Sequence, residues 1–320
     1  MKVYVVILNW NGCADTIECL ESLQHTTGVE YVAVVCDNAS SDRSMEKFAQ
    51  WAGARFAPDE WQVLDRAAAE QAQPGNARLI LIDTGANLGF AGGNNVGVRL
   101  ALRDPACEFV WLLNNDTVVA PDAIAQAVAR MQEDPRIGLC GSTLIYYHER
   151  DKVQAYGGAV YSPLRGSSRH VGAFSHPDAV PGAPQAVEST LSYVIGAAML
   201  IRRSFMEQVG LMNEDYFLYF EEVDWATRGR GEFSMGYAPR SLVYHKEGAS
   251  IGTSASGGSP LSMFYLYRNR IRFTKRFYLR YLVPVLGFCG WDVTKFVLRR
   301  RWPQARAAVK GVLQGLFSAA

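Results

Sequence analysis

Continuous apolar runs, each ending in small polar residues, recur through the first third of the chain. They occupy positions 3–8, 31–36, 79–82 and 110–113. Between them apolar residues recur at helical spacing, for example at Ile17, Leu20 and Leu23. Buried strands that alternate with helices are typical of βαβ units. The pattern therefore predicts an α/β protein with a mostly parallel central sheet flanked by helices.

The predicted strand ends carry the candidate chemistry. The carboxyl ends of parallel strands share one edge of a sheet, where ligands bind in such folds. Asp116, after the run 110–113, suits a hard cation such as Mg²⁺ or Mn²⁺ held against a nucleotide diphosphate. The alternative is that Asp116 or Thr117 caps a helix beginning near Pro121. The polar segments are Asn9-Trp10-Asn11-Gly12, Asp37-Asn38, Asn87-Leu88-Gly89, Gly92-Gly93-Asn94-Asn95 and Asn114-Asn115-Asp116.

The second half of the chain is less regular. Many Gly, Ser, Pro and His residues between 156 and 184 indicate a loop that is mobile until substrate binds. Order resumes at 191–201, and a helix at 204–209 ends at Gly210. A helix is predicted at 221–230, a strand at 241–245 and a flexible segment at 250–258. We expect a nucleotide-binding half at 1–145, a second half at 146–260 and a separate tail at 261–320.

Composition narrows the class of protein. With 320 residues, 49% hydrophobic and 20% charged, the chain has the composition of a folded globular protein. Its six cysteines show no zinc spacing and several lie in apolar runs, which predicts reduced thiols in the cytoplasm. No signal peptide is expected, because a predicted strand follows Lys2 at once.

The tail differs in charge from the rest of the chain. Residues 261–320 carry twelve basic residues and one acid, a net +11, which leaves −10 on residues 1–260. Aromatic residues are interspersed among the bases, and the apolar stretch 281–291 is too short to span a bilayer. We expect the tail to bind an anionic membrane surface, the inner face of the cytoplasmic membrane. The alternative is a helical appendage packed on the catalytic domain. Nucleic acid is not expected, because no binding motif accompanies the charge.

Seven segments in this order resemble glycosyltransferase family 2, the inverting GT-A transferases, and within it the rhamnosyltransferase-like branch. The resemblance covers roughly residues 1–280. The family's Asp-x-Asp metal motif stands here as Asn114-Asn115-Asp116, and the link 53–78 is longer than usual. The segments are 7–12, 37–42, 87–95, 113–116, 196–203, 219–225 and Tyr244-His245.

The resemblance implies an enzyme that moves a sugar, L-rhamnose from dTDP-L-rhamnose, to a saccharide hydroxyl of a lipid-linked cell-surface glycan precursor. It also implies that the half at 1–145 binds the nucleotide sugar and the half at 146–260 binds the acceptor. It favours His245, directly after a predicted strand, as a second ligand of the metal beside Asp116 or as a contact to the diphosphate; a lone His is otherwise more often structural. Gly89, Gly92 and Gly93 would allow close approach of the backbone to the donor. The predicted donor contacts are Asn9, Asn11, Asp37, Asn38, Asn87, Gly89, Gly92, Asn94, Asn114 and Asn115.

The catalytic base is sought in the acidic run Glu221-Glu222-Val223-Asp224. It follows an aromatic run, 216–220, and an apolar wall raises the pKa of a carboxyl group, as neighbouring acids do. In the family the base is the second residue of a Glu-Asp pair, which falls on Glu222, with Asp224 as the alternative. The run could instead complement a helix dipole.

Three other classes of protein are alternatives to a glycosyltransferase. An NAD-dependent oxidoreductase would need a glycine fingerprint after the first strand, and Asn9-Trp10-Asn11-Gly12 is not one. A sugar nucleotidyltransferase needs a basic Gly-rich N-terminal loop, which is missing. A noncatalytic carbohydrate- or nucleotide-binding protein would need neither Asp116 nor Glu222, and metal-dependent hydrolysis of a nucleotide sugar would distinguish it.

Overall fold

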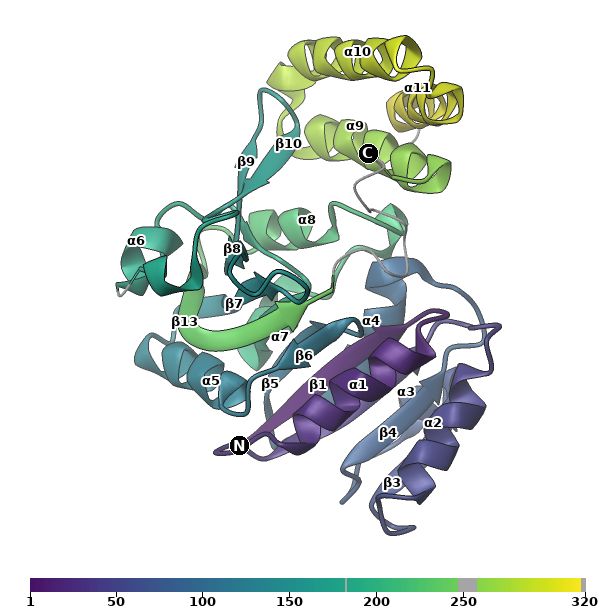
Figure 1. The fold of residues 1–320 in the computed structure, drawn as a ribbon, viewed down its shortest axis with the longest axis vertical. Helices are drawn as coiled ribbons and strands as arrows, with labels where there is room; N and C mark the ends of the chain where they lie inside the picture. Colours follow the sequence, from purple (N-terminus) through teal and green to yellow (C-terminus); the bar gives the residue numbers. More distant parts are fainter. Residues whose placement is uncertain (182, 247–257, 318–320) are drawn as a thin grey trace.

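The computed structural model describes residues 1–181, 183–246 and 258–317, and its core is one large sheet (Figure 1). Strands β1 (Lys2–Asn9), β2 (Tyr31–Asp37), β4 (Leu79–Asp83) and β5 (Cys107–Asn114) run parallel, as predicted. The strand order is β3-β4-β2-β1-β5-β12-β7-β13-β6, with β8 beside β7. The added strands are β3 (Trp61–Asp65), β6 (Thr117–Val119), β7 (Ile137–Tyr146), β8 (Val153–Tyr156), β12 (Ala198–Arg202) and β13 (Ser234–His245).

Helices cover both faces of the sheet because side chains alternate between faces along each strand. Val3, Val5 and Ile7 belong to a core cluster shared with α1 (Cys13–Gln24), α2 (Ser44–Gly53) and α5 (Ala123–Glu133). Tyr4 and Val6 belong to a second cluster on the opposite face. The helices of that cluster are α3 (Arg66–Gln71), α4 (Gly89–Leu102), α7 (Arg203–Val209) and α8 (Glu221–Arg228). The result is the three-layer α/β architecture that the sequence predicts.

The pairing register places the polar strand ends together. Asn9 pairs with Asp37, and Asp37 pairs with Asp83 on the next strand. On the other side of β1, Leu8 pairs with Asn114. The carboxyl ends of four parallel strands therefore form one edge, and the predicted convergence is confirmed.

The connections differ from what the sequence predicts. Residues 156–184 are not simply a loop, since β9 (Gly158–Ser162) and β10 (Ser167–His170) pair as a hairpin, joined by β11 (Tyr193–Val194). That segment continues into η1 (Pro177–Ala179), and α6 (Pro184–Glu188) follows it. The long link 53–78 contains α3 and β3, and β3 pairs with β4 and extends the sheet edge. Neither Asp116 nor Thr117 caps a helix, because β6 begins at Thr117 and α5 only at Ala123.

Several local predictions agree with the structure. Helix α7 ends at Val209, before Gly210 with φ +81°, and α8 begins at Glu221. The ordered stretch 191–201 is β11 and β12, separated by a turn at 195–197. All six cysteines are buried and free. The predicted flexible segment 250–258 lies, apart from Gly258, outside the described residues.

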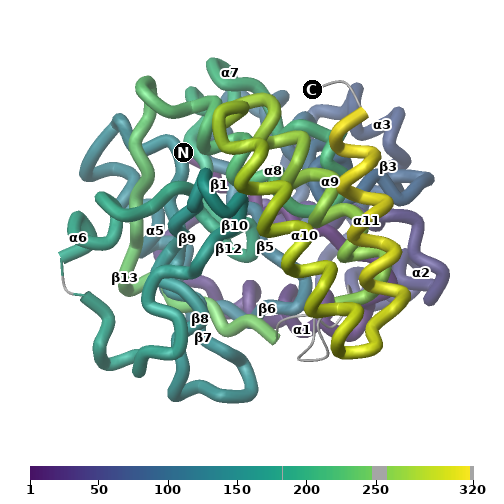
Figure 2. The backbone as a smooth tube through the Cα atoms, turned by 90° about the horizontal axis from the view of Figure 1, so that it is seen from above, coloured from purple at the N-terminus to yellow at the C-terminus, as the bar shows by residue number. Residues whose placement is uncertain are grey.

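The tail forms three helices stacked on one end of the molecule (Figure 1): α9 (Pro260–Phe277), α10 (Leu282–Leu298) and α11 (Trp302–Phe317), with η3 (Leu279–Tyr281) between the first two. Seen from above, α10 and α11 lie on the outside of this stack (Figure 2). Together, 279–298 form a helical segment long and apolar enough to cross a membrane, judged by length and composition. The predicted apolar stretch 281–291 lies within this longer segment, which also contains Asp292 and Lys295.

Candidate active site

The two predicted metal ligands lie together at the edge of the sheet. Asp116 follows β5 and His245 ends β13, and Nε2 of His245 is 3.1 Å from Oδ1 of Asp116. Both side chains are buried. The side-chain amide of Asn114 approaches the same Nε2 atom at 3.4 Å. The structure therefore brings together residues that are 129 positions apart in the sequence.

Gln154, which sequence reasoning missed, orients this imidazole. Its Oε1 lies 2.8 Å from Nδ1 of His245 and accepts the Nδ1–H hydrogen. Nε2 then faces the Asp116 carboxylate, and either a proton on Nε2 or a cation must lie between the two atoms. A proton or a divalent metal ion meets that need, so the donor set fits a metal. Within the described residues, no group of three or more His, Cys, Asp or Glu side chains is placed to hold a metal.

Neighbouring contacts fix the backbone around this pair. The backbone N–H of Lys246 donates to the carbonyl of Asp116 at 2.9 Å. Nζ of Lys246 reaches Asp15 and Glu18 of α1, each at 2.5 Å. Burial raises the pKa of Asp116, but the hydrogen bond and charge of His245 outweigh burial and hold that pKa below its ordinary value. Asp116 is thus a carboxylate, the form that binds a cation.

Four predicted donor contacts form one polar network with Ser40. Nδ2 of Asn9 donates to Asp37 at 2.6 Å, and Asn115 donates to Oδ1 of Asn9 at 3.3 Å. The hydroxyl of Ser40 donates to Asp37 at 2.7 Å and accepts from the backbone N–H of Asn11 at 2.8 Å. Asn9, Asp37 and Asn115 are buried, so these bonds hold the strand ends in register. Their contact with a donor stays a prediction.

The glycine-rich segment packs against the protein itself. Asn38 donates to Asn87 at 3.2 Å and to the carbonyl of Gly89 at 3.0 Å. A Cβ atom at Gly89, where φ is +74°, would lie 2.3 Å from the carbonyl oxygen of Phe217. Added Cβ atoms at Gly92 and Gly93 would collide with Leu88 and Leu8. These glycines permit close internal packing, and their approach to a donor stays a prediction. Asn94, also buried, donates to the carbonyl of Phe90 at 2.9 Å.

Glu222 reaches the same edge from α8. A Cβ atom added to Gly196 would lie 2.6 Å from Oε1 of Glu222, so the carboxylate rests against that backbone. The next residue, Ala197, accepts a hydrogen bond from the N–H of Asn114 at 3.0 Å, which links this contact to the strand end before Asp116. Burial raises the pKa of Glu222. A carboxylate with a raised pKa is suited to accept a proton near neutral pH.

The other two acids of this run have different surroundings. Glu221 is buried with its Oε1 unpaired, and burial together with the charge of Glu222 raises its pKa. Asp224 is fully buried and is held by Arg228 at 2.7 Å, Tyr216 at 3.0 Å and Arg276 at 3.3 Å. Its carboxylate ties α8 to neighbouring elements, so the geometry favours Glu222 over Asp224 as a base.

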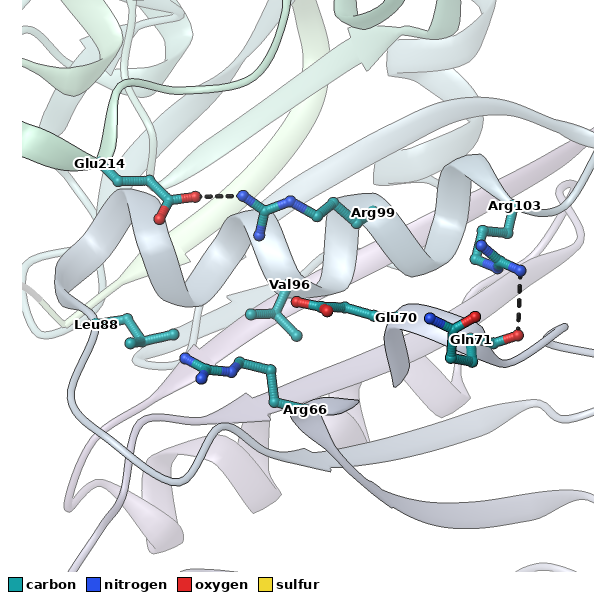
Figure 3. Close-up of a pocket in the computed structure, with 8 residues that line it drawn as sticks. All are labelled: Arg66, Glu70, Gln71, Leu88, Val96, Arg99, Arg103 and Glu214. Carbon is teal, nitrogen blue, oxygen red and sulfur yellow. Dashed lines mark hydrogen bonds and ion pairs between the residues drawn. The ribbon is translucent and has the colours of Figure 1, made fainter. Parts of the chain in front are cut away.

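A pocket of about 640 Å³ lies between α3 and α4, and none of the predicted site residues lines it (Figure 3). On its wall Arg99 pairs with Glu214 at 2.5 Å, and Oε1 of Glu214 also accepts from Asn95 at 2.9 Å. Glu214 opens η2 (Glu214–Tyr216), which leads to α8. Through Glu214, the segment that precedes Glu222 is therefore anchored to α4.

The large mixed sheet flanked by helices on both faces is the GT-A type of α/β fold. Residues 4–210, more than half of the chain, match the sequence profile described as glycosyl transferase family 2, and the chain belongs to that family. The predicted family and fold class are confirmed.

Two curated relatives are similar over much of their length. The low-salt glycan biosynthesis hexosyltransferase Agl10 of Haloferax volcanii is 23% identical over 242 residues, which cover 73% of this chain and 75% of the relative. The N-acetylglucosaminyl-diphospho-decaprenol L-rhamnosyltransferase of Mycobacterium tuberculosis is 28% identical over 204 residues, which cover 58% of this chain and 63% of the relative.

Solved structures share the fold at low identity. Mannosyltransferase PcManGT from Pyrobaculum calidifontis, in complex with GDP-Man and Mn²⁺, is 15% identical with a TM-score of 0.55, over 98% of this chain and 87% of that one. S. aureus TarS 1-349 in complex with UDP-GlcNAc is 16% identical with a TM-score of 0.58, over 98% and 81% respectively.

Proposed function

We propose that this glycosyltransferase moves a sugar from a nucleotide diphosphate donor to a saccharide hydroxyl with inversion at the anomeric carbon. The observation that carries the proposal is the Asp116–His245 pair at the carboxyl end of the sheet, with Glu222 linked to the same edge through Gly196. This arrangement offers an anionic ligand and a separate base, the two groups that such a transfer requires.

Asp116 and His245 would hold a divalent cation, Mg²⁺ or Mn²⁺, and Gln154 would keep Nε2 of the imidazole directed at it. When bound, the ion would neutralise charge on the leaving diphosphate. Asn114, whose amide already reaches this pair, would donate a hydrogen bond to the donor. Complexes of fold neighbours with Mn²⁺ support the choice of ion.

Glu222 would take the proton from the acceptor hydroxyl. Its raised pKa follows from burial, and its position against Gly196 restricts the side chain. A base held in one place lowers the entropic cost of reaching the reactive geometry. Inversion follows from a single displacement, in which the hydroxyl attacks opposite the leaving diphosphate.

The donor we propose is dTDP-L-rhamnose, and the acceptor is a lipid-linked saccharide in the synthesis of a cell-surface glycan. The mycobacterial relative, an L-rhamnosyltransferase acting on a decaprenol-linked diphosphosugar by its name, supports the sugar and the lipid-linked acceptor. The haloarchaeal relative, named for glycan biosynthesis, supports the acceptor class.

The tail would hold the enzyme on the inner face of the cytoplasmic membrane. Val283, Trp291 and Leu298 of α10 are exposed, as are Arg299, Arg300, Arg306 and Lys310 nearby. Apolar residues beside bases suit an anionic interface. Asp292 pairs with Arg270 of α9 at 3.2 Å, which favours a helix lying on the surface over one that crosses the bilayer.

A thermal-shift screen tests the proposal. Nucleoside diphosphates and nucleotide sugars are added with and without Mn²⁺, because a ligand of the native state raises its melting temperature. We expect a Mn²⁺-dependent rise that is largest with dTDP-L-rhamnose, and that disappears in Asp116→Asn while the circular dichroism spectrum is unchanged. Asp122→Asn, a change at the start of α5, is the control and should behave as wild type. An undiminished Mn²⁺ effect in Asp116→Asn would contradict the metal assignment.

A further inference from the structure

The segment that delivers Glu222 to the site has an unfavourable backbone. Between η2 and α8, three residues other than glycine have positive φ angles: Phe217 at 65°, Tyr219 at 69° and Phe220 at 78°. Bulky residues rarely adopt this conformation, and it persists only where surrounding contacts hold it. Glu221 and Glu222 follow directly. Whatever holds residues 216–220, named here the aromatic loop, therefore also sets the position of Glu222.

Helix α9 of the tail provides the contacts on one side. The side-chain nitrogen of Asn269 donates to the carbonyls of Leu218 at 2.7 Å, Tyr216 at 2.8 Å and Tyr219 at 3.1 Å. Asn269 is fully buried. Nε of Arg268 donates to its Oδ1 at 2.9 Å, which fixes the amide so that its N–H groups face the aromatic loop.

Arg268 strengthens the same attachment. Its Nη2 donates to the carbonyls of Asp215 at 2.6 Å and Tyr216 at 2.8 Å. Helix α11 supports α9 from behind, since Cβ atoms at Gly311 and Gly315 would lie 2.4 Å and 2.6 Å from the carbonyl oxygens of Phe264 and Arg268. The close packing of α11 on α9 therefore supports Arg268 and Asn269, the two residues of α9 that contact the aromatic loop.

Helix α4 holds the loop on its other side. The N–H of Phe90 donates to the carbonyl of Phe217 at 2.7 Å. Glu214 is bound by Arg99 (Figure 3) and also accepts a hydrogen bond from Asn95. These contacts belong to the catalytic domain, whereas Asn269 belongs to the basic tail. The strained loop is therefore held from both sides.

We propose that Asn269 is a positioning residue for Glu222 and acts through the aromatic loop. The tail would then complete the catalytic geometry, in addition to its proposed role at the membrane. This inference rests on the proposed role of Glu222 as the base. Loss of the Asn269 amide would let the loop relax and displace the carboxylate, while the donor site at Asp116 keeps its contacts.

The test compares Asn269→Ala with Val285→Ala in the full-length protein. Val285 is a buried residue of the α9–α10 core, so its truncation destabilises the tail without removing a contact to the loop. We expect kcat of Asn269→Ala to fall by roughly 10- to 100-fold, with donor KM within twofold of wild type, since small misplacements of a reacting group are costly. Val285→Ala should lower the melting temperature and keep kcat within twofold. Equal kcat in the two variants would overturn the inference.

A double-variant cycle separates this inference from the proposed function. If Asn269 acts through Glu222, Glu222→Gln combined with Asn269→Ala is no slower than Glu222→Gln alone. Additive losses would overturn the positioning role and leave Glu222 as the base. Full activity of Glu222→Gln alone would instead overturn the proposed function. If Asn269→Ala does not fold, Asn269→Ser, which keeps one donor, provides the same comparison.

Discussion

The carboxylate of Glu222 lies against the backbone of Gly196, and a Cβ atom at position 196 would come within 2.6 Å of Oε1. The next residue, Ala197, accepts a hydrogen bond from the backbone N–H of Asn114. The contact between Glu222 and Gly196 therefore joins the proposed base to the strand that leads to Asp116. Only a residue without a side chain leaves room for Glu222 in this position.

Gly196→Ala should therefore reduce turnover while the protein stays folded. The atom that the new methyl group meets is the end of a flexible side chain, which can move away, although the ring of Phe90 is also close at 3.0 Å. We expect kcat to fall by roughly 10- to 100-fold, as for other small misplacements of a reacting group, with little change in melting temperature. Gly290→Ala on α10, where nothing lies within 4 Å, is the matched control and should keep full activity. Unchanged kcat in Gly196→Ala would argue against Glu222 at this position.

Glu222→Gln and Asp224→Asn should fail in different ways. The introduced glutamine side chain is nearly isosteric with glutamate but cannot accept a proton, so kcat should fall roughly 10²- to 10⁴-fold with donor affinity unchanged. Asp224→Asn weakens a buried ion pair with Arg228, a kind of change that costs about 3–5 kcal/mol, and should chiefly lower the melting temperature. Kinetics and thermal melts of both variants distinguish a catalytic role from a structural one. An active Glu222→Gln beside a folded but inactive Asp224→Asn would assign the base to Asp224.

The pH profile should reflect the environment of Glu222. Burial favours the neutral carboxyl group, so its pKa lies above the ordinary value for Glu, about 4.3. Only the ionised form accepts a proton, and kcat/KM should therefore be full above the raised pKa and decline as the pH falls through it. A profile of kcat/KM with acceptor, corrected for unfolding at each pH, measures this limb. A limb at the ordinary Glu value would contradict a base whose pKa is raised by its surroundings.

Much of this arrangement could be predicted from the sequence, because local patterns encode it. Four apolar runs ending in Asn or Asp identified the parallel strands. Asp116 and His245 are far apart in the sequence, and the position of β13 in the sheet brings them into contact. Tertiary contacts account for what was missed. Strand β3 has only partly buried and exposed positions, and hairpin β9–β10 lies in a Gly- and Ser-rich segment. Asn269 lies 50 or more positions beyond the carbonyls it binds, a relationship that no local pattern reveals.

The exposed bases of the tail should bind anionic lipid. Each basic residue near such a surface contributes about 1 kcal/mol, and salt weakens the attraction. Full-length protein should co-sediment with anionic vesicles at low salt, less at high salt, and poorly with neutral vesicles. Replacing Arg299, Arg300, Arg306 and Lys310 by Gln should abolish binding without removing α9, which a truncation near residue 258 would do. Replacing Arg43, Arg66, Arg78 and Arg136, exposed on the catalytic domain, should leave it unchanged. Equal binding to neutral and anionic vesicles, or none to either, would favour a tail that only packs on the core.

Transfer of a sugar with inversion is tested most directly by the anomeric configuration of the product. Wild-type protein is mixed with dTDP-L-rhamnose, Mn²⁺ and an N-acetylglucosaminyl-diphospho lipid, and the new glycosidic bond is examined by NMR. We predict acceptor-dependent release of dTDP and a glycoside whose anomeric configuration is opposite to that of the donor. A product that retains the donor's configuration, or the absence of transfer from every nucleotide sugar offered with its acceptor, would contradict the account.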